Sequence, residues 1–244
     1  MRIPVSISKG SESRQNQLLA ALSETEYQRL VPNLELVSLP LNKVIYEPGE
    51  AIRYVYFPHQ ALVSLVSTME NGSTVEVGLV GNEGMVGLPV IWGGDTTTTR
   101  AFVQVADSGS RMKASLLKIE FDRGDQLQTL LLRYMQALHT QISQLAACNR
   151  LHMIEGRLAR WLLSVHDRMQ KDEFPLTHEF IGQMLGTRRA GVSEAAGVLS
   201  QGGMIRYTRG KITILDRPKL EATACECYGL VKSECTRLLS PECN

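Results

Sequence analysis

The chain of 244 residues is long enough for one large domain or two ordinary ones, and its 43% hydrophobic content excludes a disordered or fibrous polymer. Its 26 Lys and Arg residues nearly balance its 25 Asp and Glu residues, so any surface for a polyanion must be a local patch. No apolar run approaches the ~20 residues of a membrane span, and the N-terminal stretch MRIPVSISKG lacks the pattern of a secretory signal. We therefore expect a cytoplasmic protein that does not contact a membrane.

The first half of the chain carries the pattern of short helices followed by strands. Residues 15–31 place apolar side chains at helical spacing, with Ser23 as an internal N-cap, which predicts one or two short helices. From about residue 34 to 117 the chain changes to short β-branched or alternating stretches such as LELVSLPL, RYVYFP, RAFVQVADSG and RMKASLLKI, separated by turns such as ENGS and DSGS. About seven short strands at this spacing predict an antiparallel barrel or sandwich.

Residues 122–170 contain no proline and change to a period near 3.6, which predicts helix, with a hinge around residues 150–156. A long helix with one apolar edge favours pairing with a second copy of itself, although the edge could instead pack on the chain's own β domain. The residues predicted for a dimer interface are Leu127, Leu131, Tyr134, Leu138, Ile142 and Leu145.

The segment 175–216 reads PLTHEFIGQMLGTRRAGVSEAAGVLSQGGMIRYTRGKITILD. Thr177 can cap a short helix, and Gly186 can end it in a left-handed conformation. A second helix follows over 187–200, with Arg188 and Arg189 opposite its apolar face, and an Arg-Gly turn then joins two alternating strands. Helix, turn, helix and hairpin in this order predict a winged helix-turn-helix, whose second helix enters the DNA major groove.

Charge in this segment fits a DNA partner. Residues 175–217 hold six Arg or Lys against three acids, a net charge of +3, in a chain that is otherwise slightly negative. The guanidinium fork of arginine can bind guanine O6 and N7 together or straddle a phosphate, and Ala190 and Gly191 leave room for the DNA backbone. The residues predicted to contact DNA are Thr177, His178, Thr187, Arg188, Arg189, Gly191, Ser193, Glu194, Arg209 and Lys211.

In this order of elements, and in the sequence of the helix-turn-helix, residues 18–217 resemble the Crp/Fnr family of bacterial transcription regulators. The resemblance implies an α+β fold: a β-roll like those of cupins and cyclic-nucleotide-binding domains (1–121), a dimerisation helix (122–150) and a winged helix-turn-helix with an extra C-terminal helix (151–244). It also implies a homodimer on DNA with two-fold-related half-sites, regulated by an effector of the β-roll, and contact with RNA polymerase.

Two positions of the DNA-reading helix depart from the family pattern. Arg189 matches the family's first arginine, but Ala190 stands where a glutamate is expected, and Glu194 stands where a second basic residue is expected. The resemblance therefore implies the familiar docking of this helix with a different preferred DNA sequence.

The stretch that resembles the family's cyclic-nucleotide cassette lacks a key carboxylate. Met85 replaces the glutamate that binds the ribose hydroxyl, and a thioether is a weak acceptor. Arg100 could still neutralise a phosphate if the longer loop before it shifted, so a cyclic-nucleotide-responsive regulator is the alternative to a regulator with another effector or none. The candidate effector residues are Gly84, Met85, Gly87, Leu88, Thr99 and Arg100.

The cysteines and histidines predict no cofactor and no metal. No cysteine precedes Cys148, which argues against an Fnr-type iron–sulfur cluster, and the five histidines do not recur at ligand spacing. Residues 218–239 predict one amphipathic helix, on which Cys225 and Cys227 point about 200° apart. We expect Leu220, Cys227, Val231 and Leu238 to form its packed face and the odd set of five cysteines to stay reduced. Cys235 and Cys243 complete that set.

An enzyme is the competing class of function. VGNEGMVGLP could hold a phosphate, but it contains no lysine and does not lie between a strand and a helix. No Ser/His/Asp or Cys/His set stands at interpretable positions. A nucleotide-binding module that acts through protein contacts alone is disfavoured by the basic winged motif. The sequence therefore predicts a non-enzymatic regulator.

Overall fold

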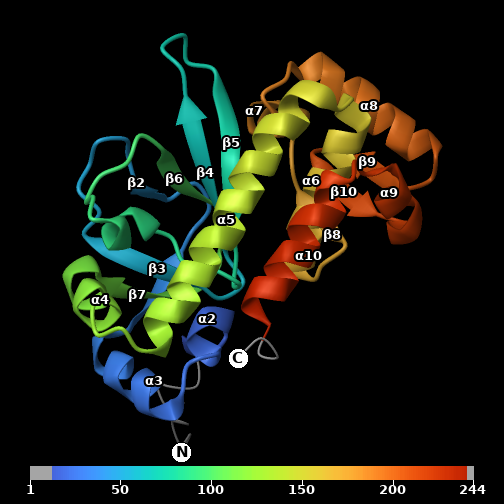
Figure 1. Cartoon of the computed structure of the whole chain (residues 1–244). Coiled ribbons are helices and arrows are strands. Elements are labelled where there is room, and N and C mark those ends of the chain that lie inside the picture. Colours follow the sequence, from blue (N-terminus) through green and yellow to red (C-terminus); the bar gives the residue numbers. More distant parts are fainter. Residues whose placement is uncertain (1–12, 241–244) are drawn as a thin grey trace, which may run out of the picture. The chain divides into compact units, whose positions relative to one another are not determined.

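The computed structural model describes residues 13–240, which divide into two compact units (Figure 1). The first unit contains residues 13–64, 79–135 and 239–240, and the second contains residues 65–78 and 136–238. Across residues 13–240, no helix combines the length and the apolar character needed to cross a membrane. Cys243 lies outside the described residues.

Two short helices precede the strands, as the sequence predicts. Helix α2 (Gln17–Ala20) is capped by Asn16, whose side chain accepts from the amides of Leu18 and Leu19. Helix α3 (Glu24–Leu30) is capped by Ser23, whose hydroxyl accepts from the Glu26 amide, and the 3-10 turn η1 (Val31–Asn33) follows. A hydroxyl or amide side chain at these positions satisfies amides that the first helical turn leaves free.

The strands form two antiparallel layers, which confirms the predicted β unit. One sheet has the order β1-β7-β3, and the other has the order β2-β6-β4-β5. Leu39, Val55, Phe57, Val63 and Val103 are fully buried between them. The strands are β1 (Glu35–Leu39), β2 (Val44–Tyr46), β3 (Tyr54–Pro58), β4 (Leu62–Thr68), β5 (Thr74–Val80), β6 (Arg100–Val105) and β7 (Asp107–Lys113).

The last part of the β region differs from the sequence prediction. DSGS is not a turn, because Asp107 already begins strand β7, which pairs with β1 and β3. A Cβ on Gly109 would lie 2.9 Å from Leu39 Cδ1 and 3.0 Å from the Phe57 carbonyl, so this glycine allows three strands to pack closely. ASLLKIEF, predicted as strand, forms helix α4 (Ala114–Phe121), and the 3-10 turn η2 (Leu88–Trp92) follows Gly87.

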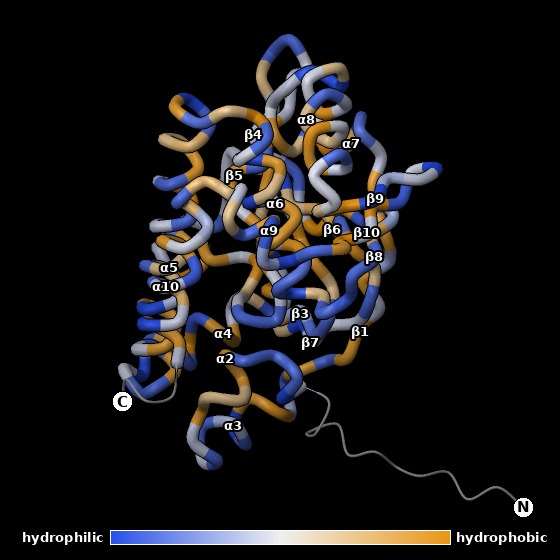
Figure 2. Tube along the Cα trace, turned by 90° about the vertical axis from the view of Figure 1, so that its right-hand side faces the viewer, coloured by the Kyte–Doolittle hydropathy of each residue, from blue (hydrophilic) through white to orange (hydrophobic). Residues whose placement is uncertain are grey.

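Two long helices follow the strands, and the chain breaks between them within the range where the sequence predicts a hinge. Helix α5 (Gln126–Leu151) and helix α6 (Ile154–Met169) are separated by His152 and Met153. The hydropathy-coloured trace shows α5 alternating between hydrophobic and hydrophilic residues along its length (Figure 2). This alternation is the pattern of an amphipathic helix, whose two faces have different environments.

The apolar edge of α5 is not available for pairing with a second chain. Of the six residues predicted for a dimer interface, five are buried within the protomer and only Ile142 is exposed. For example, Leu138 Cδ1 would lie 3.4 Å from a Cβ on Gly78 of strand β5. The interface prediction for these residues is therefore corrected in favour of the alternative that the edge packs on its own chain. The five buried residues are Leu127, Leu131, Tyr134, Leu138 and Leu145.

The helix-turn-helix and its wing lie in the second unit. Helix α7 (His178–Leu185) and helix α8 (Arg189–Gln201) are followed by strands β9 (Ile205–Thr208) and β10 (Lys211–Ile214). Strand β8 (Glu173–Pro175), which the sequence did not predict, pairs with β10 and gives the sheet order β8-β10-β9. Phe174, Ile205 and Ile212 from these strands are buried.

The C-terminal segment forms two helices rather than the single helix predicted. Helix α9 (Arg217–Thr223) ends before Ala224, whose backbone is extended, and helix α10 (Cys227–Leu239) begins after Glu226. Leu220, Cys227 and Leu238 are buried as predicted, and Val231 is half-buried. The break places Cys225 outside both helices, so the helical geometry that separated it from Cys227 does not apply.

Candidate nucleic-acid interface

The turn between α7 and α8 is built from three local features of the sequence. The Thr177 hydroxyl accepts from the Phe180 amide at 3.1 Å, and Gly186 ends α7 with a φ of +59°. A Cβ on Gly182 would lie only 2.9 Å from the Thr187 carbonyl oxygen, so the two helices can approach closely only because this residue is glycine. The predicted cap and stop of the first helix are thus confirmed.

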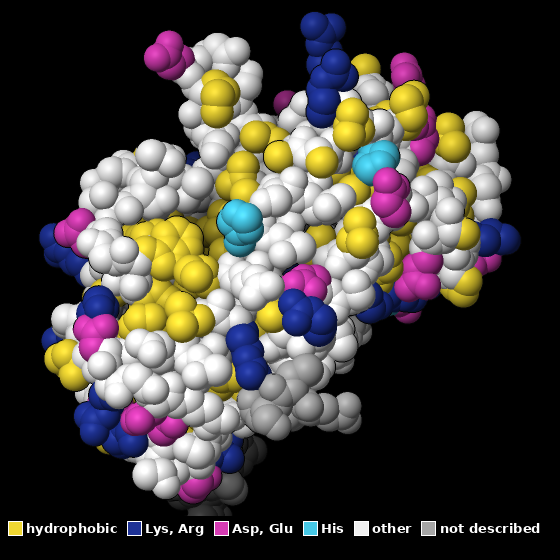
Figure 3. All heavy atoms as spheres, in the orientation of Figure 1, with side chains coloured by type: hydrophobic (Ala, Val, Ile, Leu, Met, Phe, Trp, Pro, Cys, Tyr) yellow, Lys and Arg dark blue, Asp and Glu magenta, His cyan; other side chains and the backbone are white. Residues whose placement is uncertain are grey.

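Helix α8 presents one face to the unit's core and the other to solvent. Val192, Ala196 and Leu199 are buried, as predicted. Arg188 is the N-cap residue of α8 and Arg189 is its first residue; both side chains are exposed, as are Ser193 and Glu194. The space-filling view shows Lys and Arg side chains projecting from the surface near the α7–α8 turn (Figure 3). A helix N-terminus favours anions, because its free amides and its dipole are both positive there.

The wing lies next to the start of α7. Arg209 and Gly210 form the β9–β10 turn with φ values of +48° and +79°, which matches a two-residue hairpin. A Cβ on Gly210 would lie 3.8 Å from Thr177 Cγ2, so the wing turn and the cap of α7 are neighbours. Arg209 is exposed, whereas the exposed Lys211 ammonium lies 2.8 Å from Glu173 Oε1.

His178 is held by the protein rather than directed freely at solvent. Its ring stacks on Tyr207 with a centroid distance of 3.9 Å, and its Nδ1 lies 2.9 Å from Ser193 Oγ. The Ser193 hydroxyl also contacts the Arg189 carbonyl at 3.1 Å. Burial, together with the positive charge of Arg189, lowers the pKa of His178 below its ordinary value, so the imidazole is neutral near pH 7. His178 thus links the wing to the exposed face of α8.

Arg217, one of the basic residues counted in this segment, is half-buried and bonded to other side chains of its own unit. Its guanidinium lies 2.6 Å from Asp167 Oδ1, 2.9 Å from Glu221 Oε1 and 2.7 Å from the Tyr228 hydroxyl. Burial alone would raise the pKa of Asp167, but hydrogen bonds from Arg217 and Tyr228 lower it overall. This arginine fastens α9 to α6 and is not part of the basic surface.

The candidate effector residues do not converge on an open polar site. Met85 and Leu88 are almost completely buried, and a Cβ on Gly84 would overlap the Tyr134 ring. Thr99 is half-buried, and Arg100 Nε lies 3.1 Å from Glu47 Oε1, which already supplies a negative charge to the guanidinium. Gly87 has a φ of +107° and packs near Val55. The Met85 side chain therefore packs in the hydrophobic core of the first unit.

A cavity of about 360 Å³ opens elsewhere in the first unit. It is lined by Ile45, Tyr46, residues 50–54 and Tyr56, and none of the candidate effector residues contributes to it. Burial raises the pKa of Tyr46 to about 12, so its hydroxyl stays protonated and can donate a hydrogen bond. No local pattern predicts this cavity, because its walls come from strands β2 and β3 and the loop between them.

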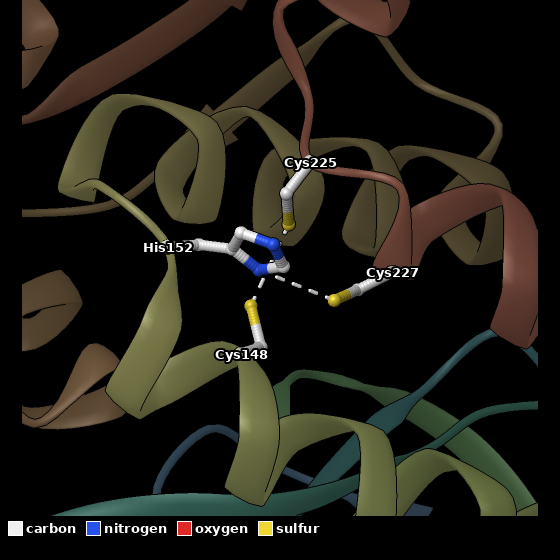
Figure 4. A group of neighbouring side chains, drawn as sticks. All are labelled: Cys148, His152, Cys225 and Cys227. Carbon is white, nitrogen blue, oxygen red and sulfur yellow. Dashed lines mark hydrogen bonds between the residues drawn. The ribbon is translucent and has the colours of Figure 1, made fainter.

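The structure also brings together three cysteines and one histidine in a cluster that the sequence did not predict. Figure 4 shows Cys148, His152, Cys225 and Cys227 pointing toward one another from the end of α5 and from the α9–α10 connection. Cys148 and Cys227 are buried, the other two residues are half-buried, and their ligand atoms all lie within 4.8 Å of one another. The i,i+4 spacing of Cys148 and His152 was a local signal, but Cys225 and Cys227 join them only after the chain has folded.

Hydrogen bonds within the cluster separate the pKa values of its thiols. A hydrogen bond from Cys225 and the positive charge of Arg160 lower the pKa of Cys148 to about 4, although burial opposes them. The pKa of Cys225 is raised because this thiol donates to Cys148 and is partly removed from solvent. The hydrogen bond to Cys148 raises the pKa of His152. The cluster therefore holds its negative charge on one thiolate while the other thiols keep their protons.

This chain matches known proteins in the sequence of its helix-turn-helix domain and in its fold. Residues 156–223 match the model of the Crp-like helix-turn-helix domain. No curated protein matches the chain. FixK2 from Bradyrhizobium japonicum is 18% identical, with a TM-score of 0.68, over 79% of this chain and 98% of that one. A CRP-family transcriptional regulator from Thermus thermophilus is 20% identical, with a TM-score of 0.63, over 77% and 96%.

A further similar structure is the c-di-GMP responsive global regulator CLP from Xanthomonas campestris. It is 12% identical, with a TM-score of 0.61, over 79% of this chain and 99% of that one. At these identities the likeness concerns the fold. The described residues therefore have the fold found in these regulators.

Proposed function

We propose that this chain, which has the fold of the Crp/Fnr transcription regulators and carries their helix-turn-helix domain, is a DNA-binding transcription regulator that acts as a homodimer. The observation that carries the proposal is the exposed N-terminal end of α8. At this end, beside the wing, Arg188 and Arg189 form no ion pair within residues 13–240. Free arginines at a helix N-terminus can bind phosphates and guanine edges.

The exposed residues divide into two groups by position. Arg189, Ser193 and Glu194 lie on the solvent face of α8 and would read base edges. Thr177, Thr187, Arg188, Arg209 and Lys211 lie around that face, at helix ends and on the wing, and would contact phosphates. Gly191 would allow close approach of the DNA backbone. His178 supports the proposal indirectly, since its contacts orient Ser193 and Tyr207.

Sequencing of genomic fragments retained by the purified protein tests this function. We expect the fragments to share a motif with two-fold-related half-sites, since a symmetric dimer presents two α8 helices to DNA. An Arg188→Ala/Arg189→Ala double variant should lose the enrichment, and an exposed-residue control, Lys219→Ala, should keep it. Retention of fragments without a shared motif by the wild-type protein would contradict the proposal.

A homodimer that pairs through α5 needs an accessible face on this helix, and exposed residues lie opposite the buried edge. Thr129, Leu132, Gln136, His139, Ser143, Ala146 and Arg150 are exposed and follow a spacing of three and four residues. This spacing is the heptad pattern by which two helices pair. The Leu132 side chain, 43% exposed, is the largest apolar group on this stripe. We place the dimer contact on this exposed stripe.

The effector of the β unit, where one exists, is proposed to be something other than a cyclic nucleotide. Met85 cannot bind a ribose, because its side chain is buried, and Arg100 already pairs with Glu47. The cavity lined by Tyr46, residues 50–54 and Tyr56 is the better candidate for a small ligand, with mixed aromatic and charged walls. Contact with RNA polymerase follows from the resemblance alone and stays a prediction.

A further inference from the structure

The cluster of Cys148, His152, Cys225 and Cys227 joins parts of the chain that are far apart in sequence. Cys148 lies in the last turn of α5, and His152 follows the end of that helix. Cys225 lies in the connection between α9 and α10, and Cys227 is the first residue of α10. All four residues belong to the second compact unit. Three thiols and one imidazole form one of the donor sets that bind zinc in structural sites.

The distances fit a single tetrahedral ion. Two sulfurs bound to one zinc at about 2.3 Å lie about 3.8 Å apart, and a sulfur and an imidazole nitrogen lie about 3.6 Å apart. The Sγ atoms of Cys148 and Cys225 lie 3.5 Å apart, and Cys227 Sγ lies 3.4 Å from His152 Nδ1. Small outward shifts would therefore complete the tetrahedron. An iron–sulfur cluster would need more space, because its ligands bind different iron atoms.

The surroundings orient the donor atoms. His152 directs Nδ1 at the thiols, and its Nε2 lies 3.1 Å from Glu226 Oε1 (Figure 4). A carboxylate on the second nitrogen fixes the tautomer that leaves Nδ1 free to bind a metal. Gln144 Nε2 donates to Cys227 Sγ at 3.2 Å, which helps to hold that sulfur in place. A disulfide would need neither the histidine nor its carboxylate.

Two buried arginines supply positive charge to the cluster. Arg157 and Arg160 on α6 are only 9% and 7% exposed, and the charges of both interact with Cys148. Within residues 13–240, the Arg157 guanidinium donates to the neutral Asn149 side chain and to the Leu185 carbonyl. A zinc ion with three thiolates and one neutral imidazole has a net charge of −1, which these arginines would balance.

We propose that Cys148, His152, Cys225 and Cys227 bind one Zn²⁺ ion in a closed structural site. Four protein ligands leave no open position for a substrate or water, so the ion would serve stability rather than catalysis. It would tie the α9–α10 connection to the end of α5, next to the hinge at His152 and Met153. The close approach of Gly156 to this connection, where a Cβ would lie 3.3 Å from the Cys225 amide nitrogen, fits the same role.

Elemental analysis of the full chain tests the site. The protein is purified without a metal-affinity step, and we expect one zinc per chain. Cys148→Ser and Cys225→Ser should each contain less than a tenth of that amount. Cys235→Ser is the matched control, because Cys235 is a half-buried cysteine of α10 outside the cluster, and it should retain the full amount. Circular dichroism compares the folding of all variants.

A second measurement does not depend on the folding of the serine variants. The reduced wild-type protein, stripped of metal by a chelator, should take up one equivalent of Co²⁺ and show thiolate-to-cobalt charge-transfer bands together with the intense visible bands of tetrahedral cobalt. His152→Cys should keep metal binding with four thiolates. Glu226→Gln should weaken zinc binding by roughly 10–100-fold, because Glu226 positions His152 rather than binding the ion.

Three outcomes would overturn the site. They are a reduced wild-type protein that neither contains nor takes up zinc or cobalt, a protein that contains iron and sulfide instead, and a Cys148–Cys225 disulfide in metal-free protein isolated without oxygen. Equal loss of zinc from Cys235→Ser and Cys148→Ser would also place the metal elsewhere. None of these measurements involves DNA, so the metal site and the proposed regulator function can fail independently.

Discussion

Gly182 and Gly191 lie on the two helices of the helix-turn-helix motif and have different surroundings. A Cβ on Gly182 would lie 2.9 Å from the backbone oxygen of Thr187, which cannot move without opening the turn. A Cβ on Gly191 would meet only the Thr187 Oγ1 atom, at 3.4 Å, which is an ordinary contact. The packing of the turn therefore explains why residue 182 is glycine. Gly191 has no such packing role, and its lack of a side chain leaves room where α8 would approach DNA.

We predict that Gly191→Ala raises the free energy of unfolding by ~0.5–1 kcal/mol, because alanine favours the helix, and yet weakens DNA binding. Gly182→Ala should lower the free energy of unfolding by ~1–3 kcal/mol through overpacking. Gly197→Ala, where a Cβ meets nothing within 4 Å, is the control for helix propensity. Urea unfolding and gel-shift titrations measure both properties. Unchanged DNA affinity of Gly191→Ala would remove the proposed reason for this glycine.

The two adjacent arginines should have separable effects on DNA binding. Arg188 occupies the N-cap position of α8, so Arg188→Ala should weaken binding to all sequences and reduce the dependence on salt. Arg189 begins the exposed face, so Arg189→Ala should mainly relax the preference at one base pair of each half-site, by ~1–3 kcal/mol. Titrations of specific and random DNA at several salt concentrations distinguish the two. Equal losses on both DNAs for both variants would contradict this division.

His178 predicts a pH dependence of stability. Its pKa is lowered in the folded protein, so the unfolded chain binds more protons as the pH falls through the ordinary value of 6.5. The contribution of the neutral imidazole to stability is thus fully present above pH 6.5 and is lost progressively below it. The urea midpoint of the wild-type protein should fall more between pH 7.5 and about pH 5 than that of His178→Gln. Parallel curves for the two proteins would exclude His178 as a cause.

At the scale of elements, helix α5 shows why an apolar edge does not identify its partner. The leucine-rich edge fits a dimer and a protomer core equally well by spacing alone, because both bury the same kind of surface. The structure buries that edge within the chain and leaves the stripe with Leu132 and Ala146 exposed. This exposed stripe is less apolar than the buried edge, so a pair of α5 helices would pack there through small and polar side chains.

Leu132→Glu should convert a dimer to a monomer without unfolding the protomer, since it places a charge in the predicted helix pair. Light scattering after size exclusion measures the mass. Leu230→Glu is the matched control, because Leu230 is a leucine on α10 that is 50% exposed, and it should stay dimeric. A Leu132→Glu protein that remains dimeric at micromolar concentration would place the contact on another surface.

The break between the C-terminal helices α9 and α10 also depends on contacts with distant residues. The sequence 218–239 predicts one continuous helix, yet the chain extends at Ala224 and begins a new helix at Cys227. The Cys225 amide donates to the Gly156 carbonyl instead of continuing the helix. Tertiary contacts therefore broke a helix that local propensity favoured, and this break is what brings the cysteines together.

For the whole molecule, we predict that calorimetry detects no tight binding of cyclic AMP or cyclic GMP. Met85, which stands where the family resemblance implies a ribose ligand, is 1% exposed, and the candidate phosphate ligand Arg100 is paired with Glu47. Glu47→Gln is an informative companion, because freeing Arg100 should not by itself create binding without a ribose ligand. Stoichiometric binding of either nucleotide by the wild-type protein would contradict the assignment.

Much of the fold followed from local signals in the sequence. Thr177, Gly186 and the Arg209–Gly210 turn marked the helix-turn-helix and its wing, because caps, left-handed glycines and two-residue hairpins each need particular residues nearby. The change of period near residue 122 separated the strands from the long helices. Each of these features depends on residues that are only a few positions apart, so it can be predicted from the sequence without knowing the tertiary contacts.

Other features depended on contacts between distant residues. Local patterns predicted the antiparallel strands, the break between the two long helices, and the helix-turn-helix with its exposed arginines. Only the tertiary structure decided that the α5 edge is buried, that Arg217 binds Asp167, and that Cys148 meets Cys225 across 77 positions. The physical reason is that spacing in the sequence shows which side chains share a face, whereas the burial of distant surfaces decides what that face contacts.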